Sequence, residues 1–130
     1  MVISTVLDFA TGAPVEGDLD TAWIHGSKRR KDCADPAFQV QRYDEHTYVL
    51  RQSKAVSAEA PFLYLLFGND RALLLDTGDS KDPSDRRLRE LIDGIIADWL
   101  TEHPRDSYQL VIAHSHGHND HVGGDGQFAD

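Results

Sequence analysis

The chain has 130 residues, the size of one domain and enough for a modest hydrophobic core. It carries 22 acidic and 13 basic side chains, for a formal net charge of −9. This charge argues against nucleic-acid backbones and anionic membrane surfaces as its main partners. One basic run, Lys-Arg-Arg-Lys at residues 28–31, is interpreted as a solvated loop.

The N-terminal residues and the cysteine content indicate where the protein works. Cys33 is the only cysteine, so no intrachain disulfide can form, which suits a reducing compartment. Residues 1–8 lack the basic region and the long apolar stretch of a signal peptide. No apolar run approaches the length needed to span a membrane. We therefore expect a cytoplasmic protein without a membrane partner.

Strands are expected mainly in the second part of the chain. Residues 1–45 are weakly patterned, and we expect only loops and short strands there. Beyond them, β-branched, aromatic or continuously apolar stretches predict strands at residues 47–51, 62–67, 71–75 and 108–113. Residues 68–70 are expected to form the turn of a hairpin. The continuous apolarity of these strands predicts that both faces of the sheet are covered.

One long amphipathic helix is predicted over residues 83–103. Asp82 is expected to be its N-cap, with Pro83 at the first helical position, and Pro104 ends it. The spacing of its apolar residues defines a single face: Leu88, Leu91, Ile92, Ile95, Ile96, Trp99 and Leu100. A hairpin, a long helix and a further buried strand together predict an α/β arrangement of layers.

A dense group of potential metal ligands follows the last predicted strand. Four of the seven histidines lie within residues 114–121, in the pattern His116-x-His118-x-Asp120-His121. Neutral imidazole and carboxylate are good ligands for zinc and similar divalent ions. His116 and His118 can lean to the same side, whereas the adjacent Asp120 and His121 point differently and can serve a second metal or a water. The alternatives are a histidine-rich surface loop without metal and a purely structural site, although structural zinc sites usually use cysteine.

Two further residues are expected to support this group. His114 lies outside the ligand spacing, and we interpret it as a residue that contacts the ligands rather than the metal. Asp76, in Asp76-Thr77-Gly78, closes a buried strand and so lies at the edge where α/β sheets place their sites. We expect it to orient a ligand histidine or the loop that carries it, the alternative being a turn-forming or helix-capping residue.

Taken in order, the hairpin into Asp76-Thr77-Gly78, the helix, and the strand into residues 116–124 (HGHNDHVGG) resemble the N-terminal half of the metallo-β-lactamase-fold metallohydrolase superfamily. The resemblance covers residues 46–124. It implies half of an αββα sandwich, with a mixed β-sheet and a flanking long helix. It also implies that residues 1–130 form a single partial domain.

The resemblance further implies a site and an activity. His116 and His118 would bind one metal and Asp120 and His121 a second, with zinc as the metal and iron or manganese in some branches. Asp120 would help to orient a bridging hydroxide, and Asp76 would be the supporting aspartate. The implied reaction is attack of a metal-bound hydroxide on an ester, thioester, lactone or similar bond of a small-molecule substrate. The family's remaining ligands come from a second half, so we expect a missing C-terminal half or a homo-oligomer.

Two other functions stay open at this point. The chain could be a non-enzymatic metal-binding half-domain, or a fragment, that self-associates through an uncovered sheet face. Alternatively, Asp76-Thr77-Gly78 resembles the catalytic turn of dimeric, retroviral-type aspartic proteases. That family continues in strands, whereas here a long helix follows, and the histidine group would be left unexplained.

Overall fold

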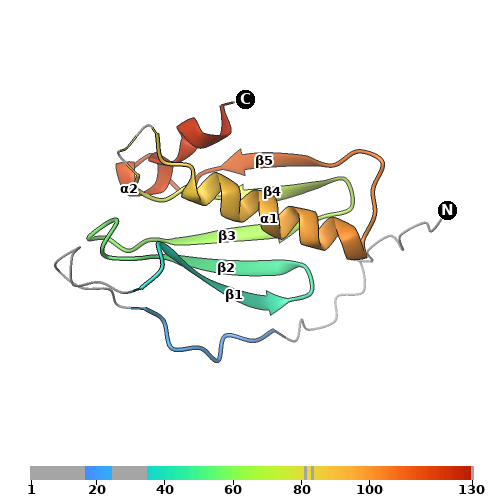
Figure 1. The fold of residues 1–130 in the computed structure, drawn as a ribbon, viewed down its shortest axis with the longest axis horizontal. Coiled ribbons are helices and arrows are strands. Elements are labelled where there is room, and N and C mark those ends of the chain that lie inside the picture. The colour runs from blue at the N-terminus through green and yellow to red at the C-terminus, as the bar shows by residue number, and fades with distance from the viewer. Residues whose placement is uncertain (1–16, 25–34, 81, 83, 130) are drawn as a thin grey trace.

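The computed structural model describes residues 17–24, 35–80, 82 and 84–129. It is an α/β structure in which one mixed sheet carries a long helix across one face (Figure 1). The strands lie in the sheet in sequence order, β1-β2-β3-β4-β5. The pairs β1–β2, β2–β3 and β3–β4 are antiparallel, and β5 is parallel to β4. The elements are β1 (Phe38–Asp44), β2 (Thr47–Gln52), β3 (Phe62–Phe67), β4 (Arg71–Leu75), α1 (Arg87–Glu102), β5 (Gln109–Ala113), α2 (Asn119–Val122) and the 3₁₀ helix η2 (Asp125–Phe128).

The predicted strands at 47–51, 62–67, 71–75 and 108–113 are confirmed to within one residue at each end. The predicted turn at 68–70 joins β3 to β4, and the main-chain N–H of Gly68 donates to the carbonyl of Arg71. The sequence did not locate β1, which lies within the weakly patterned region and carries several polar side chains. Its extended conformation is stabilised by antiparallel pairing with β2 along most of its length.

Helix α1 packs on one face of the sheet and creates the core. Residues on the predicted apolar face of α1 contact alternate side chains of β2, β3 and β4. Trp99 stacks on Phe67, with 4.7 Å between the ring centroids. The buried core residues are Leu50, Leu63, Leu65, Phe67, Ala72, Leu74, Leu88, Ile92 and Trp99. Burial of this apolar area is the main stabilising contribution to the fold.

The predicted start of the helix is wrong by one turn. Helix α1 begins at Arg87, and its N-cap is Arg86, without a side-chain cap, rather than Asp82. Asp82 instead accepts hydrogen bonds from the main chain and hydroxyl of Ser84, which form a tight local turn ahead of the helix. Such aspartate–serine bonds compete with helical hydrogen bonds and delay the helix start. Pro83 lies outside the described residues.

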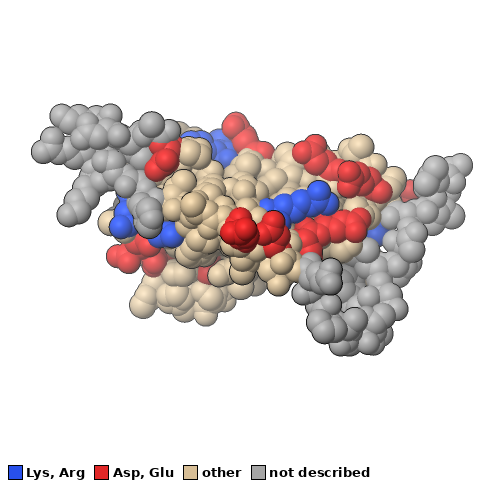
Figure 2. All heavy atoms as spheres, turned by 90° about the horizontal axis from the view of Figure 1, so that it is seen from below, with Lys and Arg blue, Asp and Glu red and all other residues tan. Residues whose placement is uncertain are grey.

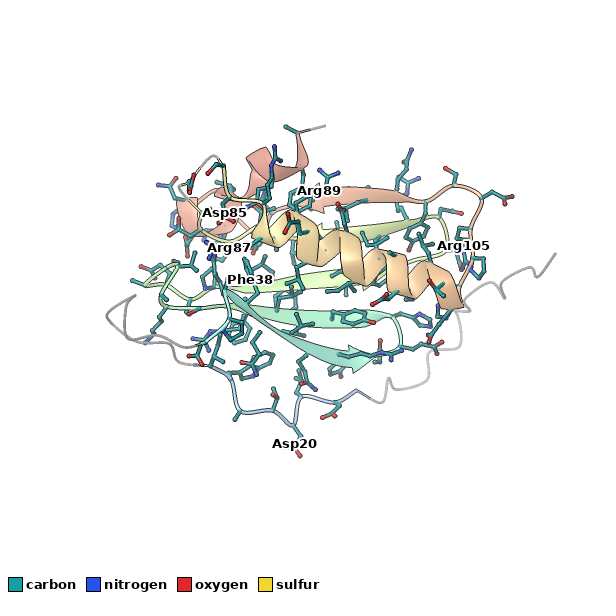
Figure 3. All side chains as sticks on the ribbon, viewed as in Figure 1. Asp20, Phe38, Asp85, Arg87, Arg89 and Arg105 are labelled. Carbon is teal, nitrogen blue, oxygen red and sulfur yellow. The ribbon has the colours of Figure 1, made fainter. Side chains whose placement is uncertain are left out.

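The first turn of α1 is capped by residues that lie outside it. Asp85 accepts hydrogen bonds from the main chain and from the guanidinium of Arg87, and the two side chains lie together at the start of α1 (Figure 3). From the C-terminal η2, the Gln127 side-chain oxygen accepts from the main-chain N–H of Arg89 at 3.0 Å. These bonds satisfy donors that every helix N-terminus leaves unpaired. The bond from Gln127 also holds η2 against α1.

The described residues cover the second face of the sheet only in part, and its full covering stays a prediction. On the face away from α1, Tyr64, Leu66 and Val111 each remain 37–38% exposed. Part of this face is covered by the segment 17–24, because Trp23 packs edge-on against Phe62 with 5.0 Å between the ring centroids. The apolar run of β3 therefore alternates in burial although it does not alternate in polarity. Self-association through this face stays a prediction.

The surface is charged and mixed in sign. On the face seen in Figure 2, acidic side chains are spread among a smaller number of basic ones, in line with the net charge of −9. Among the described residues, no helix combines the length and the apolarity needed to cross a membrane.

We expect Asp85→Asn to lower the free energy of unfolding by about 1–2 kcal/mol near neutral pH. Hydrogen bonds from the Arg87 side chain, helped by the Arg87 main chain and by Ser80, outweigh burial and hold the pKa of Asp85 well below its ordinary value of 3.8. The ionised group thus contributes stability that is present above 3.8 and lost as the pH falls through the folded-state pKa.

Urea unfolding at about pH 7 and about pH 3 measures this effect. The difference between wild type and Asp85→Asn should shrink at the lower pH. Asp93→Asn is the control, because its ion pair with Arg89 is on the surface and Asp93 is 55% exposed. It should cost less than about 0.5 kcal/mol. Equal losses in the two variants would contradict the role given to Asp85.

Candidate metal centre

The site is built where two parallel strands end side by side. Leu75 of β4 is paired with Ala113 of β5, and the main-chain N–H of Asp76 donates to the Ala113 carbonyl at 2.8 Å. The residues that follow the two strands, Asp76 on one side and Ser115 on the other, therefore meet at the same edge of the sheet. This is the edge at which open α/β sheets place their ligands.

Asp76 is the buried centre of this edge. It is 2% exposed and has a positive φ of 70°, a backbone conformation uncommon outside glycine. Its carboxylate accepts hydrogen bonds from the Ser115 main chain and hydroxyl, each at 2.7 Å, and contacts His121 Nδ1 at 2.7 Å. Burial raises the pKa of Asp76, but these hydrogen bonds outweigh it, so the pKa lies below 3.8. Asp76 is therefore ionised at neutral pH and can only accept hydrogen bonds.

The turn after β4 is bonded along its length to the chain that carries the histidines. The main-chain N–H of Thr77 donates to the His121 carbonyl, and that of Gly123 donates to the Gly78 carbonyl. The approach is too close for a side chain: a Cβ on Gly124 would overlap the Thr77 carbonyl, and one on Gly123 would lie 2.9 Å from the Ser80 nitrogen. Gly123 and Gly124 form a turn, and the absence of side chains at both positions allows this packing.

The donor atoms of His116, His118 and Asp120 all lie within 4.8 Å of one another. Asp120 and His121 lie on the short helix α2, where the sequence had predicted a loop, and His121 Nε2 is 3.1 Å from the Asp120 carboxylate. The imidazole rings of His116 and His121 are 4.0 Å apart between centroids. His116 and His118 are exposed, and Asp120 and His121 are half-buried. Three of the four predicted ligands, His116, His118 and Asp120, thus bring their donor atoms together, and His121 lies beside them, next to Asp120 and His116.

The chemistry of this donor set fits a divalent transition metal. His121 contacts the ionised Asp76 through Nδ1, so Nδ1 carries a proton, and its Nε2 lies 3.1 Å from the Asp120 carboxylate. This nitrogen either donates to the Asp120 carboxylate, when the ring is protonated, or binds a metal together with it. Donors around tetrahedral zinc are about 3.3 Å apart, given ligand distances of about 2.0–2.1 Å.

His114 faces another partner. Its Nε2 lies 2.8 Å from the carboxylate of Asp125, which also accepts a hydrogen bond from the Thr77 hydroxyl at 2.7 Å. His114 is thus tied to η2 and does not belong to the His116, His118 and Asp120 group. Its contacts connect the end of β5 to the turn after β4.

A second group of potential ligands lies at the opposite end of α1. It consists of Glu45, His46 and His103, whose donor atoms also lie within 4.8 Å of one another. Here the Trp99 indole N–H donates to His46 Nδ1 at 3.1 Å, so the proton of a neutral His46 must be on Nε2, the nitrogen nearer Glu45. His103 contacts the Trp99 carbonyl through Nδ1 and Glu45 through Nε2. This arrangement suits a protonated His103 paired with Glu45 better than a metal.

The roles of two residues of the site, Ser115 and Thr77, could not be recognised from the sequence. Ser115 looked like a spacer between two histidines, and no local pattern marks its contact with Asp76, 39 positions earlier. Thr77 was treated as part of a turn motif, but its hydroxyl bonds Asp125. The only sequence signal for these roles was the polar character of residues at the two strand ends.

Comparisons with protein-family models, with curated proteins and with solved structures give no match for this chain. The activity is therefore argued from the site itself.

Gly124→Ala should lower the free energy of unfolding by about 1–3 kcal/mol, because the added methyl would overlap Thr77 and press on the Leu88 side chain. Gly126→Ala, two residues further on, is the matched control, since its methyl would have no heavy atom within 4 Å. Urea unfolding of the two variants measures the difference. A neutral Gly124→Ala would mean that the two loops are not held this close.

We expect His116→Ala to weaken zinc binding more than His114→Ala does. The first substitution removes a donor of the convergent group, and the second removes a side chain bonded to Asp125. Loss of a residue that only supports a ligand costs about 10–100-fold in metal affinity, and loss of a ligand should cost more. A competition titration with a chromogenic chelator gives both affinities, and equal values would count against this assignment.

Proposed function

We propose that this chain carries the ligand loop of a metal-dependent hydrolase that acts on an ester, thioester, lactone or similar bond of a small molecule. The metal would be one or two zinc ions, or iron or manganese. The observation that carries the proposal is the pairing of His121 and Asp120, with His121 held by Asp76. The donors of His116 and His118 lie beside this pair.

Each residue has a distinct part in this proposal. His116 and His118 would hold the metal from the open side, and Asp120 and His121 from the side nearer the protein. When bound, zinc lowers the pKa of a coordinated water toward neutrality and polarises a carbonyl or phosphoryl oxygen. The Asp120 carboxylate can accept a hydrogen bond from the attacking water and so orient it. Asp76 holds the His121 ring in place through its contact with Nδ1.

The exposure of His116 and His118 supports access by a small-molecule substrate. His116 and His118 project into solvent from the end of the sheet, so a small molecule can reach them. Four side chains can supply the ligands of one tetrahedral ion but not of two. A dinuclear centre would therefore need ligands from a C-terminal half or from a second copy of the chain.

The contacts of Asp76 do not favour the aspartic-protease alternative. Paired catalytic aspartates share a water between two accessible carboxyl groups. Here Asp76 is 2% exposed, and both its oxygens accept hydrogen bonds from Ser115. The Asp76-Thr77-Gly78 turn serves as a support for the histidine loop.

The test begins with the protein stripped of metal by a chelator. Zinc is titrated by calorimetry, and hydrolysis of p-nitrophenyl acetate, a thioester and a lactone is followed before and after zinc is added. We expect zinc binding together with turnover of at least one substrate. Asp120→Asn should lower kcat by about 100-fold or more. Glu45→Gln, in the second group, is the matched control and should change neither quantity.

The outcomes separate the alternatives. Absence of zinc binding would overturn the proposal. Zinc binding without turnover of any of the three substrates would overturn the hydrolase and support a non-enzymatic metal-binding half-domain. Zinc binding that is lost in Glu45→Gln but kept in Asp120→Asn would place the metal at the group of Glu45, His46 and His103 and would overturn the proposed site.

A further inference from the structure

We infer that Ser115 is a positioning residue that, together with Asp76, fixes His116 and His121 in one tautomer, with the proton on Nδ1 and the Nε2 lone pair free for the metal. The inference deepens the proposed metal site and rests on it. Its physical content, the position of one proton on each ring, can be measured without metal.

The argument starts from the direction of the hydrogen bonds around Asp76. An ionised carboxylate has no proton to donate, so each of its partners must be a donor. The Ser115 main chain and hydroxyl donate to Oδ1 and Oδ2, each at 2.7 Å. His121 Nδ1 lies 2.7 Å from Oδ2 and must donate as well. His121 Nδ1 therefore carries a proton, and in the neutral ring Nε2 is the unprotonated nitrogen.

The Ser115 hydroxyl also determines which nitrogen of His116 carries the proton. A hydroxyl has one proton, and that of Ser115 is directed to Asp76. Its oxygen lies 3.1 Å from His116 Nδ1 and can therefore only accept there. His116 Nδ1 must carry the proton. The distance from the same oxygen to His121 Nδ1 is 3.5 Å, too long to compete with Asp76.

The consequence is that one buried carboxylate sets both rings. The neighbouring rings of His116 and His121, tilted by 48° to each other, both present Nε2 as the metal-binding atom. Fixing the tautomer through a hydrogen bond on the other nitrogen is the usual way in which proteins prepare a metal-binding histidine. Among the described residues, no hydrogen bond fixes the tautomer of His118, so His118 is the ligand that adapts.

The experiment is long-range ¹H–¹⁵N correlation of the imidazole rings in metal-free protein at about pH 8.5, where neutral histidine predominates. It is run on wild type, Ser115→Ala and Ser115→Thr. We expect Nδ1–H rings for His116 and His121 in wild type. In Ser115→Ala, His116 should lose this preference while His121 keeps it. Ser115→Thr retains the hydroxyl and should restore the wild-type pattern at His116.

Zinc affinity is measured on the same three proteins. Ser115→Ala should weaken binding by about 10–100-fold, and Ser115→Thr should stay close to wild type. A wild-type His116 with its proton on Nε2 would overturn the inference, as would a Ser115→Ala protein whose His116 tautomer is unchanged. The expected tautomers without any zinc binding would overturn the proposed function and leave the proton positions standing, so the two failures are distinguishable.

Discussion

The carboxylate of Asp76 is the group on which the rest of the site depends. It is buried at the end of β4 and carries a negative charge, which requires compensation by hydrogen bonds. The compensation comes from Ser115, at the end of β5, and from His121, on α2. Satisfying one charge thus joins two strands and a helix. Charge-assisted hydrogen bonds are about twice as strong as neutral ones, so this connection contributes strongly to holding the edge together.

The chain contains two groups of histidines and carboxylates with similar donor spacing, and hydrogen bonding distinguishes them. Around Asp76, oxygen atoms of Ser115 and Asp76 lie at hydrogen-bond distance from Nδ1 of His116 and His121, which in our proposal leaves Nε2 for a cation. At the far end of α1, the Trp99 indole donates to His46 Nδ1 and leaves the proton on the other nitrogen. The proximity of ligand-type residues does not by itself define a metal site. The outer hydrogen-bond partners decide which lone pairs are available.

The packing of the sheet explains why the site lies at this edge. Helix α1 joins β4 to the parallel β5, so both strands end on the same side, and the residues after them meet. The turn after β4 and the chain after β5 then pack main chain against main chain, which the glycines at 123 and 124 permit. The C-terminal η2 completes the arrangement by capping the first turn of α1 through Gln127. The segment that carries the histidines, residues 114–121, is thus held by the turn after β4, by the end of β5 and by η2, and His116 and His118 remain exposed.

Several features could be predicted from the sequence, because each is a local pattern of residue types within one segment. They are the strands at 47–51, 62–67, 71–75 and 108–113, the apolar face of α1, and the cluster of histidine and aspartate side chains at residues 116–121. Other features could not. Strand β1 is polar and is defined by its pairing with β2, and the start of α1 depends on side-chain bonds among residues 82–87. The exposure of Tyr64 and Leu66 depends on what lies over the sheet. Only the tertiary structure brings Asp76 into contact with Ser115 and His121, which lie 39 and 45 positions further along the chain. Contacts at that separation follow from strand register and helix crossover, which no single stretch of sequence encodes.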